Sequence, residues 1–285
     1  MSIHGEKKSL SLVVTVYNQP MAFEFILAAL QRQTMKDFEV IVADDGSGSE
    51  IEEIVHKAQG KTNFLISHVW QADEGFRKNV ILNKAIEKAE TDYMVFIDGD
   101  CIPHCQFLLD HWKERQPNGV LCGRRVNFSK EISESLKLED ISSGRFEKIS
   151  LKVLIDGLLA RSSNLEDGIR IENSLIQRII RFRKGRIFGC NFSVEKRLLE
   201  EINGFNEDYQ GPGLGEDSDI AFRLELLGAR LIPLRYMALL YHLYHPQTIV
   251  GGENKRIYER IVSDREVICL NGLRKLESVQ SAAIL

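Results

Sequence analysis

The sequence predicts an α/β fold in which helices flank a central, mostly parallel sheet, with a helical excursion in the middle of the chain. Two observations predict this fold. Short apolar runs rich in β-branched residues alternate with segments of helical apolar spacing over residues 10–97. Acidic residues follow two of these runs directly, at the strand ends where ligands bind in parallel sheets. Strands that alternate with helices form βαβ units, which place the strands parallel in one sheet.

Four strands and three helices are expected in the first part of the chain. The strands span residues 10–16, 38–43, 64–70 and 93–97, and the helices span residues 22–33, 51–57 and 80–90. Strands that are buried on both faces have largely apolar sequences, such as LSLVVTV at residues 10–16.

The middle of the chain differs in composition. Residues 130–186 are rich in Ser, Glu, Lys and Arg, with helical spacing at residues 151–159 and 175–182. Regular structure is expected to resume at Phe188, with helices at residues 198–202 and 220–227 and a strand-like run at residues 237–240. We therefore expect a single domain over residues 1–285, divided into residues 10–129, the excursion 130–186, residues 187–250 and a helical tail at residues 251–285.

Composition limits the class of protein. The formal net charge of −4 argues against a dedicated nucleic-acid binder, which would usually be strongly basic. The five cysteines are odd in number and scattered, so we expect them to be reduced and the protein to be cytoplasmic. Residues 1–8 are polar and unlike a signal peptide, and no apolar run approaches the ~20 residues of a membrane-spanning helix. We expect a soluble protein, attached at most to a membrane surface.

Cys101, His104, Cys105 and His111 lie close enough in sequence to form a zinc site. Their spacing does not repeat a CxxC pair, and Pro103 interrupts it. Packing cysteines and surface histidines are therefore the preferred interpretation.

Asp98-Gly99-Asp100 follows an apolar strand. Two carboxylates separated by one glycine form a compact oxygen site, which suits a Mg²⁺ or Mn²⁺ ion that keeps positions for phosphate oxygens. Gly99 lets the backbone turn and lets a ligand approach closely. The alternative interpretation is a solvated turn, in which Asp and Gly are common.

Asp44-Asp45-Gly46-Ser47 lies at the same level of the sheet, after the second strand. A carboxylate at this position accepts hydrogen bonds from a ribose or a base in nucleotide-binding folds. The alternative is a capping turn into the next helix. Two aspartates allow both roles.

A third acidic cluster, Glu216 and Asp217, follows a glycine-rich loop and leads into the helix at residues 220–227. A carboxylate held on a scaffold can act as a general base, although acidic residues also stabilise helix N-termini. His242 follows the apolar run at residues 237–240 and could complete a metal site. A lone histidine is more often structural.

Together these residues resemble the family-2 glycosyltransferases, which have the nucleotide-sugar-binding GT-A fold. The segments VVTVYN at 13–18, FEVIVADDGS at 38–47 and DGD at 98–100 resemble that family's first-strand signature, nucleotide-contacting turn and metal motif. DEGFR at 73–77 and NKA at 83–85 are similar to the bacterial chondroitin-polymerase type. FGCNFS at 188–193, GF at 204–205, GED at 215–217 and FR at 222–223 resemble the carboxyl-terminal half of galactosyl- and N-acetylgalactosaminyltransferases.

The resemblance implies a role for each matching residue. Asp98 and Asp100 would lie at the metal and the diphosphate, Asp217 would be the base, and Glu216 would lie beside it at the sugar or acceptor. The nucleotide-sugar contacts would come from Thr15, Tyr17, Asp45, Arg77, Asp98 and Gly99, and the metal ligands would be Asp100 and His242. Thr15 departs from the family pattern, which commonly has proline there. Both His242 and His245 match the family's histidine, and His242 is preferred because His245-Pro246 begins the next loop.

The implied function is transfer of a hexose or N-acetylhexosamine from a UDP-sugar to a glycan or lipid-linked glycan acceptor, with inversion, with Mn²⁺ or Mg²⁺ as cofactor. Such an enzyme would take part in bacterial surface polysaccharide or lipopolysaccharide biosynthesis. Residues 10–129 would be the nucleotide-sugar-binding half and residues 187–250 the acceptor and catalytic half. One alternative is a haloacid-dehalogenase-type phosphatase, whose Asp-x-Asp normally follows the first strand. The other alternative is a non-catalytic carbohydrate-binding homologue.

Residues 174–186, SLIQRIIRFRKGR, combine five apolar and five basic side chains at helical spacing. A basic amphipathic helix of this kind can lie on anionic lipid, which predicts peripheral contact at the inner face of the membrane. The alternative is a helix that packs on the sheet and leaves a solvated basic face.

Overall fold

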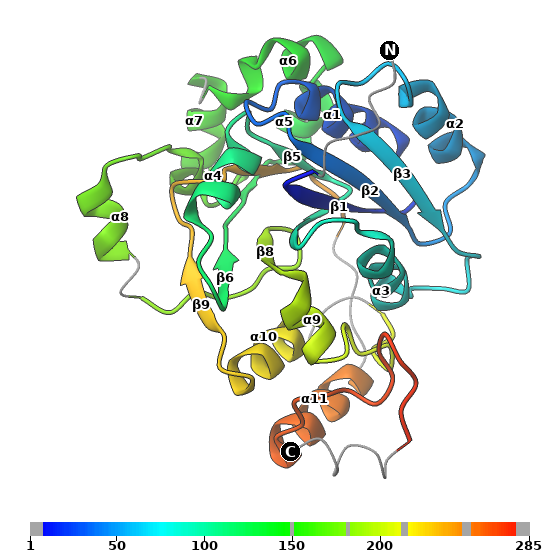
Figure 1. The fold of residues 1–285 in the computed structure, drawn as a ribbon. Coiled ribbons are helices and arrows are strands. Elements are labelled where there is room, and N and C mark those ends of the chain that lie inside the picture. Colours follow the sequence, from blue (N-terminus) through cyan, green and yellow to red (C-terminus); the bar gives the residue numbers. More distant parts are fainter. Residues whose placement is uncertain (1–7, 149–150, 181–182, 212–215, 247–251, 278–285) are drawn as a thin grey trace.

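The computed structural model describes residues 8–148, 151–180, 183–211, 216–246 and 252–277. Its centre is a seven-stranded sheet in the order β3-β2-β1-β4-β8-β6-β9 (Figure 1). These strands are β1 Leu10–Val16, β2 Phe38–Asp44, β3 Leu65–Trp70, β4 Tyr93–Asp98, β6 Gly119–Cys122, β8 Phe192–Glu195 and β9 Arg230–Pro233.

The sheet is mostly parallel, as predicted. The pairings β3-β2, β2-β1 and β1-β4 are parallel, and so is β6-β9. Strand β8 runs antiparallel to both of its neighbours, β4 and β6. The four predicted strands are confirmed, with ends that differ from the expected ones by at most one residue.

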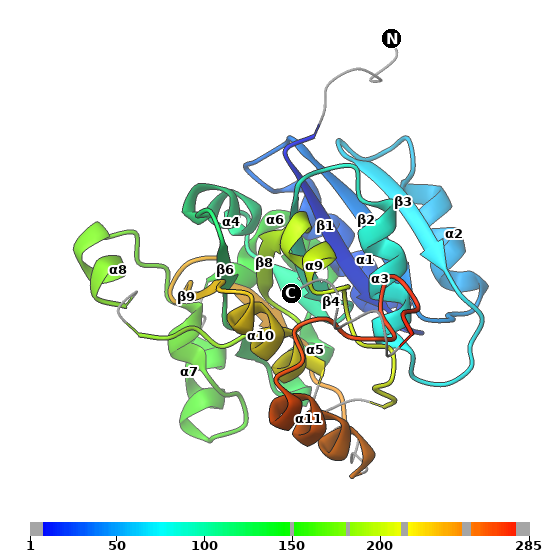
Figure 2. The same cartoon turned by 60° about the horizontal axis from the view of Figure 1, so that its bottom comes forward.

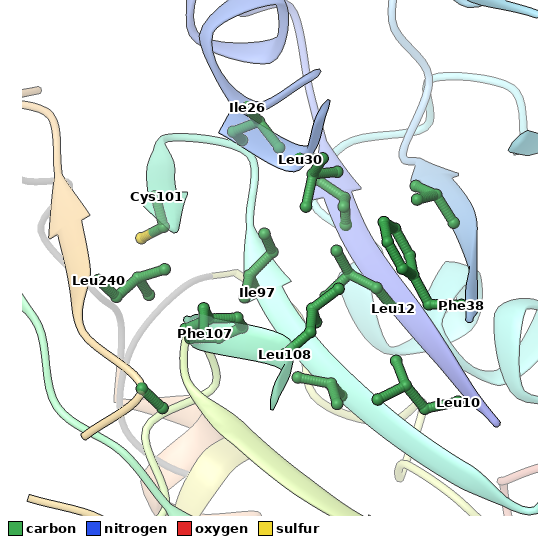
Figure 3. Close-up of a cluster of buried hydrophobic side chains, with 14 of the residues drawn as sticks. Leu10, Leu12, Ile26, Leu30, Phe38, Ile97, Cys101, Phe107, Leu108 and Leu240 are labelled. Carbon is green, nitrogen blue, oxygen red and sulfur yellow. The ribbon is translucent and has the colours of Figure 1, made fainter. Parts of the chain in front are cut away.

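Helices cover both faces of this sheet (Figures 1 and 2). Helices α1 (Pro20–Gln31), α2 (Ser49–Ala58) and α4 (Phe107–Glu114) pack in one apolar core, and α3 (Lys78–Lys88), α9 (Lys196–Glu201) and α10 (Glu216–Leu226) pack in another. Figure 3 shows part of the first core, to which Leu10, Leu12 and Ile97 of the sheet and Ile26 and Leu30 of α1 belong. Burial on both faces explains why the strands have continuous apolar sequences.

The helices expected from residues 22, 51, 80, 198 and 220 all begin two to four residues earlier, as α1, α2, α3, α9 and α10. Pro20 starts α1, because its fixed φ suits the first helical turn and its missing N–H has no partner there. Helix α3 begins at Lys78 instead of Val80, so Lys78 lies in its first turn. This start brings Lys78 to the carboxyl-terminal edge of the sheet.

A second, three-stranded sheet has the order β5-β10-β7, formed by β5 (Cys101–Pro103), β10 (Leu240–His242) and β7 (Val126–Asn127). The strand expected at residues 237–240 is wrong in its bounds, since β10 begins at Leu240 and contains His242. Tyr236 and Ala238 have φ values of 64° and 45°, which an extended strand does not allow. His242 is therefore held by strand pairing instead of following a strand.

The described part of the excursion contributes no strand to the seven-stranded sheet. Its helices are α5 (Lys130–Ser135), α6 (Leu138–Ser143), α7 (Leu151–Leu158) and α8 (Ser174–Ile180), with 3₁₀ turns η1 (Arg145–Glu147) and η2 (Leu165–Gly168). Residues 181–182 of the helix predicted at 175–182 lie outside the described residues. Helices α7 and α8 project from the same side of the molecule (Figures 1 and 2).

The tail expected to be helical is helical only over α11 (Glu253–Asp264) within its described part. Arg265, with φ of 53°, ends α11 in the left-handed conformation. The segment after it is held by the side-chain amide of Asn203, which donates to the carbonyls of Cys269 and Arg274, both at 2.8 Å. Asn203 therefore provides hydrogen bonds that a continued helix would have made internally. Residues 278–285 lie outside the described residues.

The four residues considered for zinc do not converge on one point. His111 is fully buried, where its ring nitrogens contact Ser193 at 2.8 Å and Asn191 at 3.1 Å, so its expected place on the surface is wrong. Burial lowers the pKa of His111 to about 4. His104 and Cys105 lie beside Glu147.

In the ranges that the structure describes, no helix has the length and apolar character needed to cross a membrane.

Candidate functional site

The acidic residues after β2 and β4 meet at one edge of the sheet. In the strand register, Val16 of β1 lies opposite Asp44, and Thr15 lies opposite Asp98. The carboxyl ends of the three parallel strands therefore lie level, as the sequence predicted, and the segments that follow them share one edge.

The two aspartates at the end of β2 have different partners. Asp44 is buried and holds the turn, since one oxygen accepts the backbone N–H of Ser47 at 2.8 Å and the other lies 2.9 Å from His68 Nε2. Asp45 points to the opposite segment, where it accepts from Gln71 Nε2 at 2.6 Å and from the backbone N–H of Arg77 at 2.9 Å. Burial raises the pKa of Asp45, although these hydrogen bonds oppose the rise.

Tyr17 and Arg77 lie around the same loop. The half-exposed Tyr17 donates its hydroxyl to Asp73 at 3.0 Å, and the Arg77 guanidinium lies 2.6 Å from Glu74. Gly46, with φ of 97°, lets this loop approach, because a Cβ at Gly46 would lie 2.6 Å from the Cα of Asp73. The predicted nucleotide contacts Tyr17, Asp45 and Arg77 are thus neighbours in the structure.

The backbone packs so closely at position 99 that only glycine fits there. A Cβ at position 99 would lie 2.5 Å from the carbonyl oxygen of Thr15. The Thr15 hydroxyl donates to the carbonyl of Ile97 at 3.1 Å and lies 3.3 Å from an oxygen of Asp98. Thr15 therefore holds the end of β4 and the first carboxylate of the Asp-Gly-Asp turn.

Asp100 faces two histidines. One of its carboxylate oxygens lies 3.5 Å from His242 Nε2 and 3.4 Å from His245 Nε2. Burial alone would raise the pKa of Asp100, but hydrogen bonding and positive charge from His242 lower it. Nδ1 of His245 lies 2.9 Å from the carbonyl oxygen of Pro246, which only accepts, so Nδ1 carries the proton and a neutral His245 has a free lone pair on Nε2.

Lys78 connects this turn to the third acidic cluster. Its ammonium lies 2.8 Å from Asp98 and 3.6 Å from Glu216. Burial alone would lower the pKa of Lys78, yet the charges of Asp98, Glu216 and Asp217 hold it well above its ordinary value. Sequence reasoning missed Lys78. Its position directly after Arg77, at the start of a helix that follows a strand, was the available signal.

Glu216 and Asp217 begin α10. Burial raises the pKa of Glu216 to about 7, and Lys78 opposes this rise. Asp217 accepts the backbone N–H of Gly189 at 2.8 Å, and burial raises its pKa as well. A Cβ at Gly189 would lie 2.5 Å from Asp217, so glycine makes this contact possible. Lys78 thus holds Glu216 near the Asp98-Gly99-Asp100 turn, and Gly189 holds Asp217 beside it.

Arg125 is a second residue that sequence reasoning missed. Burial alone would lower its pKa, but negatively charged neighbours, including Asp98 and Asp100, raise it. The positive charge of Arg125 in turn lowers the pKa of Asp217. The consecutive pair Arg124-Arg125 after an apolar run was the available signal in the sequence.

Two family models match the chain. The model described as glycosyl transferase family 2 matches residues 11–202, which is more than half of the chain. The model described as the N-terminal domain of galactosyltransferase matches residues 174–246. The two matched ranges together contain every candidate site residue named above.

Similar proteins include two bacterial enzymes. Chondroitin synthase of Escherichia coli is 29% identical over 263 residues, which cover 86% of this chain and 36% of that protein. The GalNAc(5)-diNAcBac-PP-undecaprenol beta-1,3-glucosyltransferase of Campylobacter jejuni is 27% identical over 258 residues, which cover 87% of this chain and 69% of that protein. The chain thus spans little more than a third of the chondroitin synthase.

Solved structures share the fold. S. aureus TarS 1-349 in complex with UDP-GlcNAc has a TM-score of 0.56 at 20% identity, covering 96% of this chain and 69% of that chain. The mannosyltransferase PcManGT from Pyrobaculum calidifontis, in complex with GDP-Man and Mn²⁺, has a TM-score of 0.55 at 17% identity. The match covers 83% of this chain and 57% of that chain.

Proposed function

Because this chain belongs to the glycosyl transferase family 2 and has the GT-A fold, we propose that it is an inverting, metal-dependent glycosyltransferase. Its donor is a UDP-hexose or UDP-N-acetylhexosamine, and its acceptor is a glycan. The observation that carries the proposal is that the half-buried Lys78 joins Asp98, from the Asp-Gly-Asp turn, to Glu216 at the start of α10. No comparison supports the phosphatase or the non-catalytic alternative, and Asp-Gly-Asp follows β4, not the first strand.

The metal ligands we propose are Asp100, His242 and His245. Their ligand atoms all lie within 4.8 Å of one another. Mg²⁺ prefers oxygen ligands, so a set with two imidazoles disfavours it, and the Mn²⁺ in the PcManGT structure supports Mn²⁺ as the cofactor. A bound cation of this kind neutralises negative charge on a departing diphosphate. Both histidines enter the proposal because both face the same carboxylate oxygen.

The nucleotide-sugar site would be formed by Thr15, Tyr17, Asp45, Arg77, Asp98 and Gly99. Asp45 already accepts hydrogen bonds within a buried turn, which gives it a fixed orientation toward a ribose or base. Lys78 forms an ion pair with Asp98, which holds that carboxylate in place. The TarS structure contains UDP-GlcNAc, which supports a UDP-sugar donor. The match to a galactosyltransferase domain favours galactose-type sugars.

Asp217 would be the general base. The Gly189 N–H fixes one of its oxygens, and its raised pKa strengthens it as a proton acceptor. Asp217 takes the proton of an acceptor hydroxyl, whose oxygen attacks the anomeric carbon from the face opposite the diphosphate. Configuration at that carbon therefore inverts. Glu216, beside the base, would contact the sugar or the acceptor.

Calorimetric titration with UDP in the presence and absence of Mn²⁺ tests the proposal. The wild type should bind UDP more tightly with Mn²⁺, and Asp100→Ala should lose that dependence. Asp264→Ala, on an exposed position of α11, is the matched control and should behave like the wild type. Equal metal-dependent UDP binding in the wild type and in Asp100→Ala would remove Asp100 from the metal site.

Donor choice needs a separate measurement, because the Pyrobaculum structure contains GDP-Man. We expect turnover of UDP-sugars in a panel that also contains GDP- and dTDP-sugars. Selective turnover of a GDP- or dTDP-sugar would contradict the donor assignment.

The cellular setting we propose is the cytoplasmic face of the membrane, in bacterial surface polysaccharide or lipopolysaccharide biosynthesis. The Campylobacter relative has an undecaprenol-linked glycan in its name, which supports a lipid-linked acceptor. Leu175, Ile176 and Ile179 of α8 are 68%, 41% and 68% exposed, so these apolar side chains do not pack on the sheet as the alternative required. Exposed apolar groups beside basic residues suit an anionic lipid surface.

A further inference from the structure

A cavity lies near the segment that holds the proposed base. It has a volume of about 320 Å³, and its lining includes Arg124, Arg125, Asn127, Phe188 and Arg235. Phe188 directly precedes Gly189, whose N–H holds Asp217, and Asn127 pairs with His242 in the small sheet. The cavity is therefore close to the segment that holds Asp217 and to the strand that contains His242.

The charges of the cavity do not cancel. Arg235 is paired with two lining carboxylates, Asp167 at 2.8 Å and Glu166 at 3.4 Å. Arg124 and Arg125 have no carboxylate within 4.0 Å in the part of the chain that the structure describes. Both guanidinium groups belong to half-buried residues, and that of Arg124 lies 4.7 Å from the centre of the Phe188 ring. The lining has three arginines against Glu166 and Asp167, so one positive charge is in excess and neither Arg124 nor Arg125 has a carboxylate partner there.

Metal binding would increase this excess charge. Asp98 and Asp100 are among the negative groups that raise the pKa of Arg125. A divalent cation at Asp100 would offset that negative charge. The positive charge of Arg125 would then be less compensated by the protein, and an anionic ligand would bind there more favourably. The lining residue Asn127 also has a side-chain oxygen, Oδ1, that is buried without a hydrogen-bond partner. A sugar hydroxyl can donate to this oxygen.

We propose that this cavity binds an anionic group of the acceptor, held by Arg124 and Arg125 while Asn127 accepts from a neighbouring hydroxyl. This inference rests on the proposed function, since it assigns the cavity to the acceptor. The group is an oxyanion, either the carboxylate of a hexuronate or a phosphate ester. Arginine presents paired N–H donors that match both of these groups, and such charge-assisted hydrogen bonds are stronger than neutral ones.

Matched probes that differ only in charge test the assignment. Methyl β-glucuronide is compared with methyl β-glucoside, and glycerol phosphate with glycerol, by NMR titration of the protein alone and with UDP and Mn²⁺. We expect each anionic probe to bind about tenfold or more tightly than its neutral partner. The tighter of the two anionic probes identifies the source of the oxyanion.

Variants connect the preference to the two arginines. Arg124→Gln and Arg125→Gln should each lose most of the preference for the anionic probe. Arg125→Lys should keep part of that preference, because lysine keeps the positive charge but lacks the paired N–H donors of the guanidinium. Arg256→Gln on α11, where the side chain is 81% exposed, removes the same charge elsewhere and should change nothing. Thermal unfolding of each variant reports whether it is folded.

Two results would overturn the inference. One is equal binding of charged and neutral probes by the wild type. The other is a loss of UDP affinity in the Gln variants with an unchanged preference for the anionic probe, which would assign the arginines to the diphosphate. UDP binding by the wild type is measured in a separate titration, which shows whether the proposed donor site is correct. The probe titration of the protein without UDP and Mn²⁺ tests the cavity whatever that result is.

Discussion

Lys78 neutralises carboxylates that come from distant segments of the chain. Asp98 belongs to the metal-motif turn and Glu216 to the start of α10, and both lie within ion-pair distance of its ammonium. A buried pair of this kind is costly to break from one side, because an unpaired charge is left in a poorly solvated place. Lys78 therefore keeps the two acidic clusters close to each other.

Asp217→Asn tests the general base. The amide keeps the shape of the side chain but cannot take a proton, so we expect a loss of transfer of ~10²–10⁴-fold with unchanged UDP affinity. Steady-state transfer and calorimetric UDP binding are the two measurements. Asp264→Asn on α11 is the control, and transfer by Asp217→Asn near the wild-type rate would show that another group is the base.

Glu216 predicts a pH dependence of stability. Its pKa is raised to about 7, mainly by burial, so the folded state binds this proton more tightly than the unfolded state. The stabilisation that protonation provides is complete below the ordinary pKa of 4.5 and is lost as pH rises to about 7. Relative to the wild type, Glu216→Gln should therefore gain about 1–3 kcal/mol in stability as pH rises from 5 to 8.

Thermal unfolding of the metal-free protein between pH 5 and pH 8 measures this difference. Glu253→Gln, at an exposed position of α11, serves as the control. A difference in Tm between Glu216→Gln and the wild type that stays constant over this range would contradict the assignment.

At the scale of elements, the junction of β1 and β4 sets the geometry of the metal-motif turn. The backbone at Gly99 approaches the carbonyl of Thr15, and the Thr15 hydroxyl reaches Asp98. The start of α3 has a comparable role, because the first residue of that helix is Lys78. Short backbone segments at strand and helix ends therefore decide where the charged side chains lie.

Gly99→Ala tests this junction. The added Cβ would lie 2.5 Å from the Thr15 oxygen and 3.2 Å from the Val16 Cα, both backbone atoms that cannot rotate away. We expect a loss of about 1–3 kcal/mol in stability, together with weaker Mn²⁺-dependent UDP binding. Gly252→Ala, where a Cβ would have no neighbour within 4 Å, is the control for thermal unfolding. Equal stability of Gly99→Ala and the wild type would show that the junction can relax.

At the scale of the whole molecule, the excursion exposes apolar surface away from the sheet. Leu154, Ile155, Leu158 and Leu159 in and after α7 are 47%, 48%, 87% and 57% exposed, and α8 exposes three more apolar side chains. Both helices lie on the same side of the protein (Figures 1 and 2). Arg183 and Lys184 follow α8 and are exposed. This side is the surface we expect to meet a membrane.

Liposome flotation tests the membrane contact. The wild type should float with anionic vesicles at low salt, and less so at high salt, because each basic residue near the surface contributes about 1 kcal/mol. Changing Arg181, Arg183 and Lys184 to Gln should reduce flotation further, although Arg181 lies outside the described residues. Lys255 and Arg256 changed to Gln provide the control. Absence of flotation at low salt would contradict the membrane contact.

Sequence patterns by themselves determined the four parallel strands, the two acidic turns that follow them and the acidic start of α10. Each of these features depends on a short run of consecutive residues. Strands buried on both faces need continuous apolar runs, and turns are rich in Asp and Gly. The strands β6, β8 and β9 were missed, since four residues are too few for a periodic pattern to be recognised.

Only the tertiary structure decided which charged side chains meet. Lys78 pairs with Asp98 and Glu216, His245 joins His242 at Asp100, and Arg124 and Arg125 line a cavity with Phe188. These contacts join residues that lie far apart in the sequence, and they depend on where α3 begins and how β10 pairs with β5 and β7. No local pattern encodes such distances, because they arise from the packing of whole elements against one sheet.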